Sequence, residues 1–202
     1  KMKSNFLAYR HSFLFFIGIA MGFAACRSGQ PAITRIAFGS CGHQDEPQPV
    51  LTLAAQRQPD AFIFLGDNIY GDTDNMDTLK AKYNRWMNST DFKNLKSATR
   101  ILATWDDHDY GFNDAGADFP YKAQAKALFA AFFGIPPGAE RLTRDGVYDA
   151  QIIGPNGRRV QIILLDIRSF KSPWKPTDAW DEPGRQRYVP DEDPYFSMFG
   201  KK

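Results

Sequence analysis

The chain has 202 residues, enough for one domain with a substantial hydrophobic core. Its hydrophobic fraction of 43% and charged fraction of 24% are ordinary for a globular protein and exclude wholesale disorder. The formal net charge of +2 includes three basic residues within the first 25 positions, where no acid occurs, so residues 26–202 carry a net charge of −1. Such a nearly neutral body excludes a basic surface for DNA or RNA.

The amino-terminal segment has the pattern of a secretory signal peptide. Lys1, Lys3 and Arg10 precede an apolar run over residues 13–25, which ends in small side chains. This run is too short to serve comfortably as a permanent membrane span. We therefore expect residues 1–25 to direct export of the protein.

Cys26 directly follows the apolar run, and residues 23–26 resemble a bacterial lipobox, in which the cysteine is lipidated. The pattern predicts a periplasmic or cell-surface lipoprotein of a bacterium, with simple secretion and a free Cys26 as the alternative. A linker over residues 26–31 and one domain over residues 32–202 would follow. If Cys26 carries lipid, Cys41 has no disulfide partner within the chain, so it is either a buried inert thiol, a metal ligand or a nucleophile.

Strands and helices alternate in the predicted domain. Apolar runs predict strands, helical spacing of apolar residues predicts helices, and a turn at residues 154–157 predicts a hairpin. In chain order we expect a strand at 33–38, a helix at 50–57, a strand at 61–65, a helix at 78–87 capped by Asp77, a helix at 91–97, a strand at 101–104, a helix at 121–133, and hairpin strands at 147–153 and 159–166. This order predicts an α/β fold, with layers around a mixed sheet.

The segment at residues 171–202 contains five prolines and no predicted helix or strand. A structureless stretch of about thirty residues is uncommon inside a compact domain. We interpret this segment either as an active-site loop or as a sign that the chain is a piece of a larger protein.

Polar side chains follow the second predicted strand. Asp67 and Tyr70 lie three residues apart on the turn after residues 61–65, so both oxygens can face one point beyond the edge of the sheet. Because an unpaired buried charge is costly, such a group favours a multivalent cation. A tight turn with a half-buried tyrosine is the structural alternative. The acidic residues at 72–77 depart from a calcium-binding loop, and we interpret them as a solvated loop and helix cap.

A second cluster follows the third predicted strand and consists of Asp106, Asp107, His108 and Asp109. Three carboxylates around one imidazole again favour a cation. His108 beside Asp109 could also act as an oriented acid or base. His43 could bind metal as well, but a solvated position in its loop is the favoured interpretation.

Arg168 follows the last predicted strand. Its planar guanidinium matches the geometry of a phosphate or a carboxylate, with two parallel hydrogen bonds. A structural ion pair between Asp166 and Arg168 is equally compatible with their spacing.

Together these motifs resemble a known family, the PhoD-like metallophosphoesterases, often called alkaline phosphatase D. Residues 36–45, 61–72, 102–114 and 163–170 resemble its successive sequence blocks, in order and with fitting spacing. The run WDDHDYG after LGDNIYGD is the most specific part of the resemblance.

The resemblance implies a calcineurin-like α/β sandwich of mixed sheets flanked by helices, incomplete at its carboxyl terminus. It also implies hydrolysis of phosphate monoesters or diesters by a metal-activated water. Iron(III) would be bound by Cys41, Asp67 and Tyr70. Asp67 would bridge to a second ion, calcium, with Asp107 assisting.

In the same resemblance, His108 donates a proton to the leaving group and is oriented by Asp109. Arg168 holds the phosphate, and Asn68 contacts the substrate. The expected partners are a small phosphate ester and, through Cys26, a membrane. The family carries further metal-ligating Asp and His residues in a later block, and no histidine follows His108. The alternative function is therefore a non-catalytic exported lipoprotein that keeps the scaffold with an incomplete metal site.

Overall fold

Three parallel strands form the central sheet of the chain, which a computed structural model describes over residues 31–200. β1 (Ile36–Gly39) and β3 (Arg100–Ala103) flank β2 (Ala61–Phe64) in parallel register. All four residues of β2 are buried, because it has a strand on each side and a packed layer on each face. The apolar run that predicted this strand is typical of parallel sheets.

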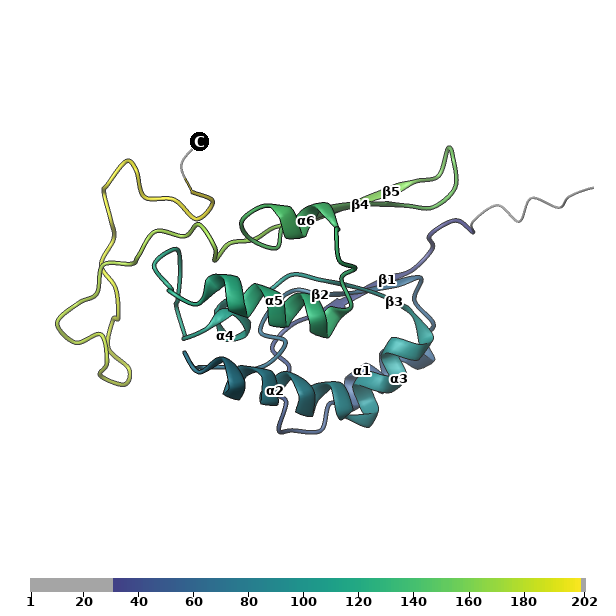
Figure 1. Ribbon diagram of the computed structural model, residues 1–202, viewed down its shortest axis with the longest axis horizontal. Helices are drawn as coiled ribbons and strands as arrows, with labels where there is room; N and C mark the ends of the chain where they lie inside the picture. Colours follow the sequence, from purple (N-terminus) through teal and green to yellow (C-terminus); the bar gives the residue numbers. More distant parts are fainter. Residues whose placement is uncertain (1–30, 201–202) are drawn as a thin grey trace, which may run out of the picture.

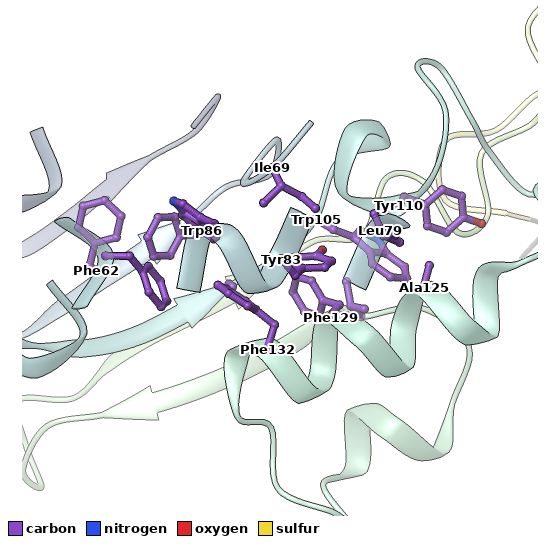
Figure 2. Packing of buried hydrophobic residues seen from close by; sticks show 14 of the residues in the cluster. Phe62, Ile69, Leu79, Tyr83, Trp86, Trp105, Tyr110, Ala125, Phe129 and Phe132 are labelled. Carbon is purple, nitrogen blue, oxygen red and sulfur yellow. The ribbon is translucent and has the colours of Figure 1, made fainter. Parts of the chain in front are cut away.

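Helices cover one face of the sheet (Figure 1). They are α1 (Pro49–Gln56), α2 (Met76–Asn88), α3 (Thr90–Ala98) and α5 (Lys122–Phe133), with α4 (Asp107–Tyr110) as a short addition. The short helix α6 (Glu140–Thr143) lies on the other side of the sheet. Phe62 and Phe64 belong to the core between β2 and the helices, where Phe64 packs edge-on against Trp86 with ring centroids 5.1 Å apart. Figure 2 shows that aromatic rings dominate this core.

A hairpin covers the opposite face of the sheet. Its antiparallel strands are β4 (Asp149–Ile153) and β5 (Val160–Leu164). Ala61 and Ile63, which alternate with the phenylalanines of β2, pack in a second apolar cluster with side chains of this hairpin. The predicted α/β fold with parallel and antiparallel strands is confirmed, but the two directions lie in separate sheets rather than in one mixed sheet.

Two local predictions differ from the structure. α2 begins at Met76, two residues before Thr78, because Asn75 and not Asp77 is its N-cap: the side chain of Asn75 accepts a hydrogen bond from the amide of Thr78 at 3.0 Å. For the cluster after β3 the sequence predicted no helix, and the structure forms the single turn α4 there. Reciprocal hydrogen bonds between Asp106 and Asp109, a capping box, stabilise that turn.

The segment at residues 171–200 contains no helix or strand, as predicted. It is nevertheless folded back on itself, because the amide of Thr177 donates to the carbonyl of Arg187 at 2.9 Å and Pro176 bridges to Tyr188. We call this segment the tail. Among the described helices, none combines the length and apolar character needed to cross a membrane.

The predicted signal peptide, the lipidation site at Cys26 and the linker up to residue 30 lie outside the described residues.

Candidate metal centre

The loops that follow the three parallel strands meet at the carboxyl edge of the sheet. The amide of Cys41 donates to the carbonyl of Gly66 at 3.3 Å, and the amide of Gly71 donates to the carbonyl of His108 at 2.9 Å. Gly66 and Gly71 lie so close to neighbouring loops that no side chain fits at either position. A Cβ on Gly66 would lie 2.6 Å from the Cβ of Asp106, and a Cβ on Gly71 would lie 2.5 Å from the carbonyl oxygen of His108. The two charged clusters are therefore brought together, as their positions after neighbouring strands predicted.

Several residues of these loops have a left-handed backbone, which is unfavourable for side chains other than glycine. The φ angles are 60° at Cys41, 50° at Asp67, 44° at Asp72 and 64° at Asp114. Each such residue costs about 1–2 kcal/mol, so the surrounding fold must hold it in place. Strain of this kind concentrates at sites where side chains must be aimed at one point.

Asp67, Asp107 and His108 form a group whose ligand atoms all lie within 4.8 Å of one another. Oδ1 of Asp67 is buried and has no hydrogen-bond partner among the described residues. Burial, followed by the charges of Asp106 and Asp107, raises the pKa of Asp67. A cation would supply the missing partner and relieve this repulsion, so the residues present fit a metal ion.

Cys41 and Tyr70 border this group. The Cys41 thiol donates to Oδ2 of Asp67 at 3.8 Å. Burial and then the charges of Cys41 and Asp67 raise the pKa of Tyr70. The Tyr70 ring contacts two imidazoles, with centroids 4.3 Å from His108 and 5.2 Å from a stacked His43. The predicted ligands Cys41, Asp67, Tyr70 and Asp107 are thus neighbours, and His43 lies at their margin.

Asp72 orients His108. Its Oδ1 lies 2.6 Å from Nδ1 of the imidazole, which leaves Nε2 to face other groups. Partial burial lowers the pKa of His108, but the hydrogen bond and charge of Asp72, with the charges of Asp107 and Asp67, outweigh it, and the pKa is raised. The sequence placed Asp109 in this orienting role, and the structure instead uses a residue interpreted as part of a solvated loop.

Asp109 is fully buried beneath the site. Its carboxylate accepts hydrogen bonds from the amides of Asn68, Ile69 and Asp106 and from Nδ2 of Asn68, at 3.0–3.2 Å. Burial raises the pKa of Asp109 to about 7, although those amides act in the opposite direction. Asp109 therefore joins the loop after β2 to the start of α4.

Asn68 lies under the site rather than at its surface, with 1% of its area exposed. Its Nδ2 donates to the carbonyl of Thr104 at 3.0 Å as well as to Asp109. In this position Asn68 supports the loop that follows β2, and its predicted contact with substrate stays a prediction.

Arg168 joins the two carboxylates at the start of α4. Its Nε pairs with Oδ1 of Asp106, and its Nη2 lies 3.4 Å from Oδ1 of Asp107. Nη1 is buried and has no partner among the described residues. The guanidinium does not form the alternative ion pair with Asp166. Asp166 instead accepts hydrogen bonds from the backbone amides of Arg168 and Ser169, at 3.0 and 2.9 Å.

Comparison with known proteins gives a match among the solved structures. No protein-family model and no curated protein matches the chain. Among solved structures, that of PhoD matches with a TM-score of 0.54 and 18% sequence identity, over 80% of this chain and 38% of the PhoD chain. The fold is thus a mixed α/β arrangement similar to part of PhoD, and the chain spans well under half the length of that protein.

Proposed function

We propose that the chain belongs to a metal-dependent phosphoesterase that hydrolyses phosphate monoesters or diesters. The observation that supports this best is the convergence of Asp67, Asp107 and His108, with Arg168 in an ion pair with Asp107. In a phosphoesterase, the carboxylates would bind the metal ions, and the neighbouring guanidinium would attract the phosphate of the substrate. The similarity in fold to PhoD agrees with this proposal.

Asp67 and Asp107 are proposed to hold metal ions, with Cys41 and Tyr70 as ligands to the harder one, iron(III), and calcium as the second. Carboxylate oxygens suit both ions, whereas a thiolate and a phenolate suit iron. Bound ions would lower the pKa of a water molecule and neutralise the phosphoryl oxygens.

His108 is proposed as the proton donor to the leaving-group oxygen. Its hydrogen bond to Asp72 fixes the ring and favours the protonated form through the raised pKa. Nε2 is then the nitrogen available to the substrate. This assignment keeps the role predicted for His108 but transfers the orienting role from Asp109 to Asp72.

Arg168 is proposed to attract the phosphate by its charge, from beside the proposed metal ligands. Two of its nitrogens are held by Asp106 and Asp107, so the guanidinium is fixed before the substrate arrives. A fixed donor loses little entropy on binding, which favours its use in the transition state.

We further propose export of the protein and a lipid anchor at Cys26, on the basis of the amino-terminal sequence. Metabolic labelling with a radioactive fatty acid tests this. Label in the membrane fraction is expected for the full chain and is expected to disappear in Cys26→Ser, with export unchanged. Equal labelling of both proteins would contradict the anchor.

The decisive experiment combines metal analysis with hydrolysis of a chromogenic phosphodiester by the full chain. We expect bound iron, and we expect His108→Ala to reduce kcat by about two to four orders of magnitude with the metal retained. The control His43→Ala removes the other imidazole beside Tyr70 and should change kcat little. Loss of metal in His108→Ala would make His108 a ligand instead of the acid. Absence of metal and hydrolysis in the full chain would favour the non-catalytic scaffold.

A further inference from the structure

Asp114 connects the candidate metal ligand Asp107 to the rest of the chain. The amide of Asp114 donates to Oδ2 of Asp107 at 2.6 Å, while Oδ1 of Asp107 faces Arg168 at 3.4 Å. One oxygen of Asp107 is therefore fixed by a hydrogen bond, and the other faces a positive charge in an ion pair. This matters because the terminal torsion of an aspartate has broad minima, so neighbouring hydrogen bonds set the plane of its carboxylate.

The tail holds Asp114 at several points. Its carboxylate Oδ2 accepts a hydrogen bond from the hydroxyl of Tyr188 at 2.6 Å and lies 3.1 Å from Nη1 of Arg187. Its carbonyl accepts a hydrogen bond from Nζ of Lys171 at 3.0 Å, and Lys171 is only 1% exposed. These contacts fix both the backbone and the side chain of a residue whose φ of 64° is unfavourable by itself.

The contacting residues of the tail also support one another. Nζ of Lys171 lies 4.3 Å from the centroid of the Trp174 ring, and that ring packs edge-on against Tyr188 at 4.6 Å. Tyr188 in turn bridges to Pro176 across the fold of the tail. A segment without helix or strand therefore presents an ordered set of donors to Asp114.

We propose that Asp114 is a positioning residue, held by Tyr188 and Arg187, that sets the carboxylate of Asp107 for cation binding. The proposal rests on the proposed function, since it assigns Asp107 to a metal. It gives the tail a role in the site that neither the sequence motifs nor the fold comparison supplies. Hydrogen-bonding partners of metal ligands typically contribute about tenfold to a hundredfold to metal affinity.

Tyr188→Phe tests the coupling, because it removes only the hydroxyl that Asp114 accepts from. In the full chain, we expect Ca²⁺ to bind about tenfold more weakly by isothermal titration calorimetry. We also expect faster hydrogen exchange at the Asp114 amide in metal-free protein, measured by NMR. The control Tyr195→Phe removes a hydroxyl elsewhere on the tail, from a residue that is 74% exposed, and should leave both values unchanged.

The two readouts separate this proposal from the function on which it rests. An unchanged exchange rate at Asp114 in folded Tyr188→Phe would overturn the coupling whether or not metal binds. Faster exchange with unchanged Ca²⁺ affinity would show that the tail supports only the loop, which also overturns the proposal. If the unaltered chain bound no Ca²⁺ or iron, the metal-dependent function and the role of Asp114 toward a cation would both be refuted. Arg187→Gln provides a second variant with the same expected direction should Tyr188→Phe not fold.

Discussion

Asp109→Asn should destabilise the protein, although the substitution preserves the size and shape of the side chain. The buried carboxylate accepts hydrogen bonds from three backbone amides and one side-chain amide. An asparagine has one acceptor oxygen and one NH₂ group, so one pair of these donors would face another donor. The substitution therefore replaces one of the two acceptor oxygens by a donor group, without creating a cavity.

The magnitude follows from the number of donors left without an acceptor. If NH₂ replaces Oδ2, the amide of Asp106 and Nδ2 of Asn68 lose their partner. A buried donor without an acceptor costs about 1–3 kcal/mol, so the two donors together cost about 2–6 kcal/mol. Asparagine carries no charge, so the substitution also removes the burial penalty that raises the pKa of Asp109, and this gain offsets part of the cost. The expected net loss is about 1–3 kcal/mol, compared with the roughly 5–15 kcal/mol that stabilises a typical domain.

Urea unfolding of the metal-free protein would measure the loss. At roughly pH 8, above the folded-state pKa of about 7, Asp109 is ionised. With a slope of about 2 kcal/mol/M, the midpoint should fall by about 0.5–1.5 M. Asp118→Asn is the matched control, because Asp118 is exposed and should leave the midpoint nearly unchanged. A shift in Asp109→Asn no larger than that of the control would refute the argument that Asp109 joins the two loops.

Three further substitutions test other parts of the site. Asp72→Asn should lower the pKa of His108, measured by NMR titration of metal-free protein. An unchanged pKa would show that Asp72 does not stabilise the protonated imidazole. The folded-state pKa of His108 lies above its unfolded value of 6.5, so the His108–Asp72 pair stabilises the fold fully below pH 6.5. This stabilisation is lost as the pH rises through the folded-state pKa, and Asp72→Asn should remove this pH dependence of the unfolding free energy. Arg168→Lys should raise KM for a phosphodiester by about tenfold to a hundredfold, since a lysine cannot hold two carboxylates and a phosphate at once; an unchanged KM would remove Arg168 from substrate binding. Cys41→Ser should release iron at lower chelator concentrations than the unaltered chain, and equal retention would exclude Cys41 as a ligand.

The parallel sheet could be predicted from sequence because its strands are short, apolar and followed by polar loops. β2 is buried on both faces, so a continuous apolar run identified it without ambiguity. The boundaries were less certain: β1 begins at Ile36 instead of Ile33, and the N-cap of α2 is Asn75 instead of Asp77. Several polar residues near a helix start can each serve as its cap, and the choice depends on loop geometry that the sequence does not contain.

The gathering of Cys41, Asp67, Tyr70 and Asp107 was also predictable, because neighbouring parallel strands deliver their following loops to one edge. The partner of His108 was not. Asp109 is adjacent in sequence, and adjacent residues on one helical turn point in different directions, so proximity along the chain was misleading.

Asp72 and Asp114 were missed for a related reason. Both lie in loops, and both act through a left-handed backbone that turns a side chain or an amide toward the site. Aspartate tolerates this conformation better than most residues, but it is also common in solvated loops, so its presence gave no distinguishing signal.

The charge balance of the site gives a reason for its construction. The carboxylates of Asp106 and Asp107 share the guanidinium of Arg168, whereas Asp67 lies beside them with a buried oxygen that has no partner among the described residues. Removing one carboxylate would lessen the repulsion, yet each remaining one would still need a positive partner. A cation satisfies all of them at once, and its binding energy can offset the backbone strain at Asp67. Site residues that are individually unfavourable are thus expected to become favourable together when a metal ion is bound.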